Sequence, residues 1–258
     1  MSIRLLLPGL LAAAVLAGCG GAPAEHAVAA KHPQRSAAAK HGQRCIAGTY
    51  ESYASPRLAY AAVVIHHAVA RHRPGGRVMA RFGRLNLNGL PMIFGVRGAL
   101  LGRACRPTWY RVQLPIRPNG SVGWVPARAV TLAKIHTRIV VDISARRLTL
   151  FRNGRPVLGS RVAVGAPGTP TPEGSFYVNQ RLVPTDPSGP YGPAAVGVSA
   201  FSNVLTGWAQ GGPIGIHGTN EPWSIGHTDS NGCIRLPNAV IRRLFKQVLS
   251  GTPVIIHP

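Results

Sequence analysis

Alternating apolar and polar positions predict short β-strands along most of the chain beyond residue 45. Residues 108–114 alternate large apolar with polar side chains, which is the period of a half-buried strand. Asn119-Gly120 predicts a hairpin turn, and residues 122–125 predict the returning strand. Residues 60–70 are apolar and fit either a strand or a helix, but they are too few to span a membrane. We therefore expect a first strand-rich unit at 46–133.

A second strand-rich unit is expected at 136–258. Asn153-Gly154 predicts a turn between two of its strands, and the Pro- and Gly-rich residues 184–193 predict a surface loop. Near the end, Asn238 is a good helix N-cap, apolar residues follow at helical spacing, and Ser250-Gly251 marks the stop. Strands are expected at residues 138–143, 148–151, 156–164, 175–178, 212–217 and 252–256.

The first residues predict the compartment. Arg4 precedes an apolar stretch, residues 5–17, which is too short to cross a bilayer and has the length of a signal-peptide core. It ends in Leu16-Ala17-Gly18-Cys19, which resembles the lipobox at which bacterial prolipoproteins are lipidated and cleaved. We expect a signal peptide at 1–18 and a lipidated Cys19 that anchors the protein to the outer face of the cytoplasmic membrane. An ordinary signal peptide cut nearby is the alternative, and either one predicts export.

The composition agrees with a mainly β protein. Gly (31) and Pro (23) are frequent and charged residues make up only 14%, which favours short strands and turns over long surface helices. The 258 residues, 45% of them hydrophobic, suffice for one large domain or two modest ones. Residues 19–45 contain almost nothing large and apolar, so we expect a flexible tether there.

The charge predicts an anionic partner. The formal net charge is +22, with only seven acidic residues, and such a field attracts polyanions. The arginines are scattered through strand-like segments, without the basic helix or stacking aromatics of a nucleic-acid module, so we expect no nucleic acid. Anionic wall polymers or lipid head groups fit an exported protein better. Compositional drift towards arginine remains the alternative explanation.

The four cysteines divide into roles. Besides Cys19, the natural pair for a disulfide in an oxidising compartment is Cys45 and Cys105. The alternative is that both are buried free thiols. Cys233 is left over, and an odd thiol in an exported protein is a candidate for a reactive group.

His217 and Cys233, sixteen residues apart, are the candidate catalytic pair. Cysteine chemistry needs a thiolate, and a neighbouring imidazole can remove the thiol proton and later return it to a leaving amine. Gly232 permits a tight turn that brings backbone N–H groups near an oxyanion. The carbonyl of Gly218 or of a neighbour is expected to fix the imidazole tautomer. Arg235 suits a substrate that carries carboxylates.

The run from His217 to Arg235 resembles the signature of the YkuD family of L,D-transpeptidases. That signature is a strand ending in His-Gly, a loop, and then Ser-x-Gly-Cys-x-Arg, here Ser230 to Arg235. The stretches IVVDISARRLTLFRNG, TPTPEGSF and GTPVII also match in the family's order, so the resemblance covers about residues 136–258. Asn231 departs from the histidine that many members have, and we expect it to tune the site. In front, WYRVQLPIRPNGSVGWV resembles the SH3-like barrels that precede catalytic domains in wall enzymes.

The resemblance implies the fold and the reaction. It implies a mainly β protein, with an SH3-like small β-barrel at 46–133 followed by a YkuD-type β-sandwich with one packed helix. It implies that Cys233 attacks a donor tetrapeptide stem of peptidoglycan, releases D-alanine and passes the acyl group to an acceptor amine in a 3→3 cross-link. His217 would be the base, and Gly218, Ser230, Asn231, Gly232 and Arg235 would bind the substrate or the oxyanion. We expect a monomer without metal or organic cofactor.

Three other readings are weighed against this one. With water as acceptor, the same site would give an L,D-carboxypeptidase. A non-catalytic wall-binding lipoprotein with a vestigial site is a second alternative, disfavoured by the intact His217 and Cys233. A zinc site formed by His217, His227 and Cys233 is disfavoured because no second cysteine or spaced pair of histidines lies nearby.

Overall fold

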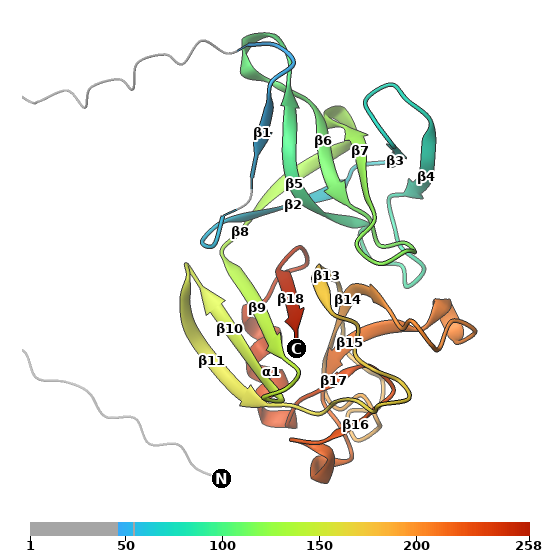
Figure 1. Cartoon of the computed structure of the whole chain (residues 1–258), viewed down its shortest axis with the longest axis vertical. Coiled ribbons are helices and arrows are strands. Elements are labelled where there is room, and N and C mark those ends of the chain that lie inside the picture. The colour runs from blue at the N-terminus through green and yellow to red at the C-terminus, as the bar shows by residue number, and fades with distance from the viewer. Residues whose placement is uncertain (1–45, 54) are drawn as a thin grey trace, which may run out of the picture. The chain divides into compact units, whose positions relative to one another are not determined.

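A computed structural model describes residues 46–53 and 55–258, which form a mainly β protein (Figure 1). The mainly β fold class is confirmed. The predicted signal peptide, the lipidated Cys19, the tether at 19–45 and Cys45 lie outside the described residues, so these stay predictions. Among the described residues, no helix has the length and apolar character needed to cross a membrane.

The N-terminal sheet contains eight strands, with order β4-β3-β7-β6-β5-β2-β8 and β1 added beside β5. The apolar segment 60–70, which fitted strand or helix, forms two strands with a turn between them. The predicted hairpin joins β6 and β7, with Gly120 at φ 79°. The SH3-like assignment of this unit stays a prediction. The strands are β1 (Tyr50–Ser52), β2 (Ala59–Val64), β3 (His67–Arg71), β4 (Val78–Gly83), β5 (Ile93–Leu101), β6 (Pro107–Gln113), β7 (Val122–Pro126) and β8 (Val130–Ile135).

The second sheet also has eight strands, in the order β11-β10-β9-β18-β13-β14-β15-β17. β13 is shared, because its first half pairs with β18 and its second half, beyond a register shift, pairs with β14. A small parallel pair, β12-β16, lies beside it. The strands are β9 (Thr137–Asp142), β10 (Arg147–Arg152), β11 (Arg155–Arg161), β12 (Val164–Gly165), β13 (Gly174–Leu182), β14 (Ala195–Phe201), β15 (Pro213–His217), β16 (Thr228–Ser230), β17 (Ile234–Arg235) and β18 (Pro253–His257).

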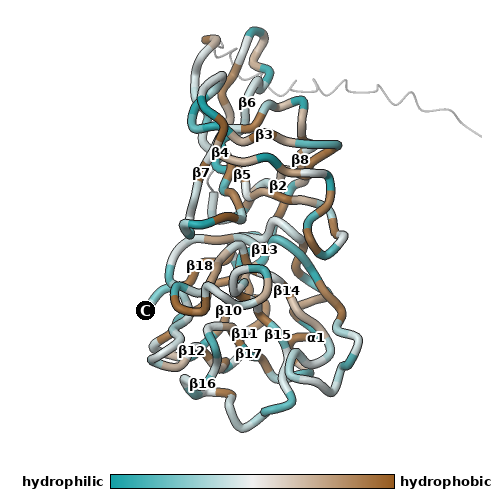
Figure 2. The backbone as a smooth tube through the Cα atoms, turned by 90° about the vertical axis from the view of Figure 1, so that its right-hand side faces the viewer, coloured by the Kyte–Doolittle hydropathy of each residue, from teal (hydrophilic) through white to brown (hydrophobic). Residues whose placement is uncertain are grey.

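One apolar core unites both halves of the second sheet with the helix α1 (Asn238–Gln247). Ile139 and Leu148 from one half meet Val196 and Ile216 from the other in this core. Figure 2 shows apolar residues recurring along the strands, and the buried ones of the second sheet form this core. Burial of each such side chain contributes roughly 1.5–3 kcal/mol to the free energy of folding. This stabilises the packing of the two halves of the sheet and the helix. Short 3-10 turns interrupt the loops: η1 (Arg103–Cys105), η2 (Ala127–Ala129), η3 (Ala209–Gly211) and η4 (Pro222–Ser224).

The prediction that Asn238 caps the helix is wrong. The N-cap is Pro237, and no side chain caps the helix. The Asn238 carboxamide instead accepts a hydrogen bond from the Thr219 N–H at 2.8 Å. The Asn238 side-chain oxygen, which the sequence predicts to cap the helix, therefore accepts from a backbone amide 19 residues away.

The β6–β7 hairpin holds the loop that leads into β15. Asn119 exchanges two hydrogen bonds with the Phe201 backbone, since its Oδ1 accepts from the Phe201 N–H at 2.9 Å and its Nδ2 donates to the Phe201 carbonyl at 2.8 Å. Arg117 donates to the carbonyls of Ser202 at 2.7 Å and Gly211 at 2.8 Å. Residues 202–212 are thus fastened near both ends, immediately before β15.

Replacing Asn119 with alanine should lower the free energy of unfolding by about 1–3 kcal/mol, because it leaves a part-buried N–H and carbonyl without partners. Urea denaturation measures the change. Asn203→Ala is the matched control, since it removes only an exposed contact of 3.3 Å to the same carboxamide. Equal effects of the two substitutions would contradict the proposed fastening.

Candidate active site

The candidate pair lies on two adjacent parallel strands. β15 pairs with β17 so that His217 faces Arg235 and Ile216 faces Ile234. Ile216 and Ile234 are fully buried, and side chains alternate between the faces of a strand. Cys233, one residue before β17, lies beside Gly215, whose N–H donates to its Sγ at 3.4 Å. The register therefore places His217, Cys233 and Arg235 on one face of the strand pair.

His217 is buried in a fixed orientation. His217 is only 5% exposed, and its Nδ1 lies 2.6 Å from the Gly218 carbonyl oxygen. Since a carbonyl only accepts, Nδ1–H is the donor and Nε2 keeps its lone pair for a proton. Burial lowers the pKa of His217 to about 4, and the nearby Arg235 charge adds to this, while the Gly218 hydrogen bond opposes it. The imidazole is therefore neutral at pH 7.

Cys233 is the free cysteine of the described residues. Burial raises the pKa of its thiol, against smaller lowering effects of the Gly215 N–H and the Arg235 charge. The resting pair is then a thiol and a neutral imidazole. Within the part of the chain that the structure describes, no hydrogen bond joins the two side chains. Proton transfer from sulfur to Nε2 must accompany the attack, as in general-base catalysis.

The turn before the nucleophile is tied by Ser230. Its buried hydroxyl donates to the Cys233 carbonyl at 2.5 Å and accepts from the Gly232 N–H at 3.2 Å. Gly232 has φ 101°, a backbone conformation that favours glycine. Its own N–H donates to the Ser230 hydroxyl, and the expected role of Gly232 at the oxyanion stays a prediction. The N–H of Cys233 has no acceptor among the described residues, so it is the amide left for that purpose. Asn231 is exposed, and nothing in the structure explains its departure from the common histidine.

Arg235 already has a carboxylate partner. Its Nη1 donates to Glu221 Oε2 at 2.6 Å, and Asp229 Oδ2 lies 3.9 Å away. The Arg235 side chain is 17% exposed and that of Glu221 40%. A substrate carboxylate would therefore compete with Glu221 or use the other guanidinium edge. Carboxylate recognition by Arg235 stays a prediction.

One contact of His217 and one contact of the backbone that follows it were not predicted from the sequence. The Tyr191 ring meets the His217 imidazole edge-on, with centroids 5.0 Å apart and planes at 71°. Asn238 packs against Gly218 while it binds the Thr219 N–H. Residue 191 lies in the loop predicted at 184–193, but no local pattern in the sequence links it to the strand that ends at His217. The Tyr191 ring restricts movement of the imidazole, and Asn238 holds the backbone at Thr219, two residues further on.

Gly218→Ala should damage both stability and activity. A Cβ at this position would overlap the Asn238 carboxamide oxygen and lie 2.8 Å from Pro193 Cδ. We expect a loss of about 1–3 kcal/mol of stability from overpacking, and a displaced imidazole. Thermal melting and turnover of the same sample measure the two effects. Gly168→Ala is the control, because an added Cβ there meets nothing within 4 Å. Identical behaviour of the two variants would contradict the tight packing around Gly218.

Cys105 is disulfide-bonded in the structure. Its expected partner, Cys45, falls outside the described residues, so the Cys45–Cys105 pairing stays a prediction.

Comparisons with known proteins identify the family of the region that carries the candidate pair. The model of the L,D-transpeptidase catalytic domain, YkuD, matches residues 136–256. YqjB of Bacillus subtilis is 34% identical over 128 residues, which cover 46% of this chain and 69% of that protein. The chain belongs to the YkuD family of L,D-transpeptidases. YkuD of the same organism is 39% identical over 119 residues, 46% of this chain and 65% of its own length.

The family model and these sequence relatives cover about half of the chain. The NMR structure of the catalytic domain from the Enterococcus faecium L,D-transpeptidase is 27% identical, and the aligned part covers 47% of this chain and 96% of that one, with a TM-score of 0.35. The family assignment rests on the sequence relatives. The YkuD domain of this chain includes β9–β18 and α1, with the candidate pair on β15 and just before β17.

Proposed function

We propose that this protein is an L,D-transpeptidase that forms 3→3 cross-links in peptidoglycan through a cysteine acyl-enzyme. The observation that carries the proposal is the pairing of β15 with β17, which puts the fixed, neutral imidazole of His217 on the same strand face as the Cys233 thiol. A thiol and a base in this relation are the parts of nucleophilic acyl transfer.

In the first step, Cys233 Sγ attacks the carbonyl of the third residue of a donor tetrapeptide stem while Nε2 of His217 takes the thiol proton. The Cys233 N–H, which has no acceptor among the described residues, donates to the oxyanion and stabilises it. Collapse of the tetrahedral intermediate breaks the bond to the terminal D-alanine. The imidazolium returns its proton to the leaving amine, which gives a thioester and D-alanine.

In the second step, the side-chain amine of an acceptor stem attacks the thioester. His217 removes a proton from the amine and returns it to the Cys233 sulfur. One amide bond is broken and one is formed, so neither an oxidant nor an energy source is required. The hydrogen bond from Nδ1 to the Gly218 carbonyl holds the same tautomer through both steps.

Incubation with defined muropeptides, followed by mass spectrometry, tests this function. Dimers joined 3→3, each with a donor stem shortened to a tripeptide, are expected together with released D-alanine. Tripeptides and D-alanine without dimers would make water the acceptor and the protein an L,D-carboxypeptidase. Unchanged muropeptides would leave a wall-binding protein. The predicted lipid anchor at Cys19 is tested separately by Cys19→Ala, which should release the protein from membranes or leave it unprocessed.

A further inference from the structure

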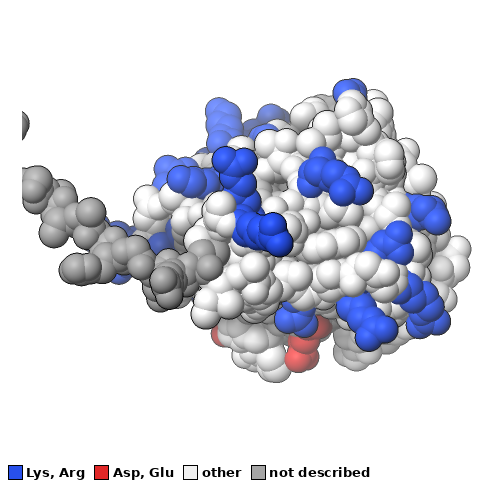
Figure 3. All heavy atoms as spheres, turned by 90° about the horizontal axis from the view of Figure 1, so that it is seen from above, with Lys and Arg blue, Asp and Glu red and all other residues white. Residues whose placement is uncertain are grey.

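Among residues 46–53 and 55–258, almost all Lys and Arg side chains lack a carboxylate partner. Of the 24 Lys and Arg among the described residues, Arg235 alone lies within ion-pair distance of a described carboxylate. Residues 46–135 carry 13 basic residues against a single acidic one, Glu51. Figure 3 shows Lys and Arg spread over one whole face, with Asp and Glu only at its lower edge. Such a field raises the local concentration of anions.

One cavity gathers this charge away from the candidate active site. It has a volume of about 620 Å³ and lies between residues 57–58, before β2, and the β10–β11 hairpin. Three arginines and a histidine line it, with no carboxylate among the lining residues: Arg57, Arg152, Arg155 and His136. Like charges around one cavity repel each other, and a bound anion would relieve that repulsion.

The hairpin turn fixes the geometry of the cavity. Asn153 and Gly154 have φ values of 51° and 79°, which are those of a two-residue hairpin turn. The Asn153 N–H donates to the His136 carbonyl at 2.8 Å, which holds residue 136 against the turn. A Cβ on Gly154 would lie 3.2 Å from Arg57 Cγ, so the Arg57 stem runs alongside the turn.

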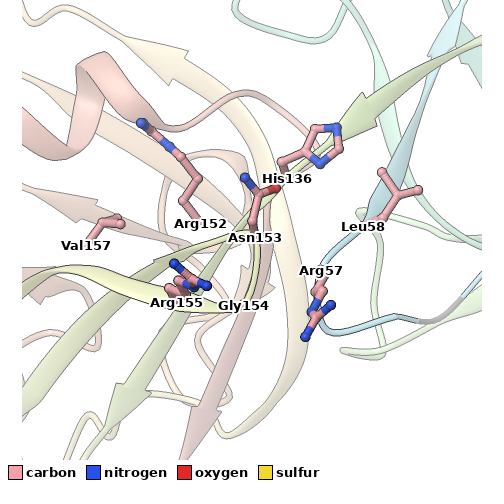
Figure 4. A pocket seen from close by; sticks show the side chains of 8 residues that line it. All are labelled: Arg57, Leu58, His136, Arg152, Asn153, Gly154, Arg155 and Val157. Atoms are coloured by element: carbon pink, nitrogen blue, oxygen red, sulfur yellow. The ribbon is translucent and has the colours of Figure 1, made fainter.

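Two guanidinium groups are available to a ligand. Figure 4 shows Arg57 and Arg155 on opposite sides of the Gly154 turn, with the His136 imidazole and the Asn153 carboxamide nearby. The side chains of Arg57 and Arg155 have no hydrogen-bond partner within the described part of the chain. Arg152 donates to Gln247 Oε1 at 3.1 Å on α1, which leaves it less mobile. Planar guanidinium groups bind phosphate oxygens with two parallel hydrogen bonds.

We propose that this cavity is a binding site for phosphate groups, with Arg57 and Arg155 as its principal ligands. The chemistry fits a phosphate of a soluble phosphodiester polymer and a phosphate of a lipid head group alike. The site is independent of Cys233 and His217, so it would attach the protein to an anionic surface without entering the reaction.

Calorimetric titration of the whole chain with pyrophosphate, at low ionic strength, tests the proposal. Saturable binding is expected. The double variant Arg57→Gln/Arg155→Gln should weaken it tenfold or more, since each charge-assisted pair contributes roughly a factor of ten. The control Arg81→Gln/Arg84→Gln removes the same charge from exposed positions outside the cavity. Equal weakening by both variants, or no saturable binding, would overturn the proposal.

Chemical protection covers the case in which the cavity variant does not fold. Phenylglyoxal modifies exposed arginines, and pyrophosphate should protect Arg57 and Arg155 of the wild type while leaving Arg81 reactive, as read by peptide mass mapping. Lack of protection would count against the site.

Two further arms distinguish the sources of the phosphate. Competition by a glycerol phosphate polymer would identify a soluble polymer, and sedimentation with phosphatidylglycerol vesicles but not phosphatidylcholine vesicles would identify a lipid head group. Either effect must disappear in the Arg57→Gln/Arg155→Gln variant, and failure of both arms would overturn the assignment. Turnover of soluble muropeptides should be the same in this variant as in the wild type.

Discussion

Cys233→Ala should abolish D-alanine release from tetrapeptide donors, with a fall of about 10⁴-fold or more to background, because the acyl group then has no nucleophile. Labelling by an acylating carbapenem should disappear as well. The fold should persist, since the only hydrogen bond that the sulfur makes among the described residues is the long one from the Gly215 N–H. Release of D-alanine by chromatography and thermal melting measure the two outcomes.

Cys233→Ser is the matched variant for this prediction. It replaces the thiol with a hydroxyl of similar size, yet the variant should remain nearly inactive because a hydroxyl is far harder to ionise than a thiol. Retained cross-linking in Cys233→Ala would refute the assignment. Inactivity accompanied by a large loss of thermal stability would point to a structural role for the sulfur instead.

His217→Ala should slow acylation by about 10²- to 10⁴-fold and change its pH dependence. In the wild type the imidazole, with its pKa lowered to about 4, is unprotonated above that pH, while burial raises the pKa of the Cys233 thiol. The acylation rate should therefore rise through about pH 4 and then stay level up to the thiol pKa. Without the imidazole, only spontaneously formed thiolate reacts, so the rate should rise about tenfold per pH unit over the same range.

Rapid-mixing measurements of carbapenem acylation between about pH 5 and 8 provide the test. This range lies between the lowered pKa of the imidazole and the ordinary pKa of a cysteine thiol. Tyr191→Phe serves as control, because it keeps the ring against His217 and should keep the level profile. Parallel wild-type and His217→Ala profiles would show that the imidazole is not the base. A level profile in both, with an equal rate, would remove His217 from the mechanism.

Much of the fold follows from local pattern in the sequence. Asn153-Gly154 forms the turn of the β10–β11 hairpin, where both residues have positive φ. Asn119-Gly120 lies in the longer connection between β6 and β7, where Gly120 has positive φ and Asn119 does not. Strand β7 alternates buried and half-buried positions, whereas Val112 and Gln113 at the end of β6 and Leu114 directly after it are all buried. Residues 60–70 stayed ambiguous because two short strands with a turn between them give a continuous apolar run.

The site was predictable in part. The sequence predicts His217 and Cys233 as a pair because nucleophilic cysteine chemistry requires a thiol with a base beside it, and glycines flank both residues. In the structure, the register of β15 with β17 brings the two residues to one face. The partners of these residues were not predictable, because each is brought in by tertiary structure. Glu221 binds Arg235 from another loop, Tyr191 reaches His217 from 26 positions away, and Asn238 serves Thr219 instead of its own helix.

The covalent intermediate is the most direct test of the central claim. The wild-type chain is mixed with a tetrapeptide donor in the absence of acceptor, quenched in acid and digested for peptide mass mapping. The account predicts a thioester on the peptide that contains Cys233, heavier by the donor minus D-alanine, which disappears in Cys233→Ala and is consumed when acceptor stem is added before quenching. D-alanine release without any acyl group on Cys233, or an acyl group on another residue, would contradict it.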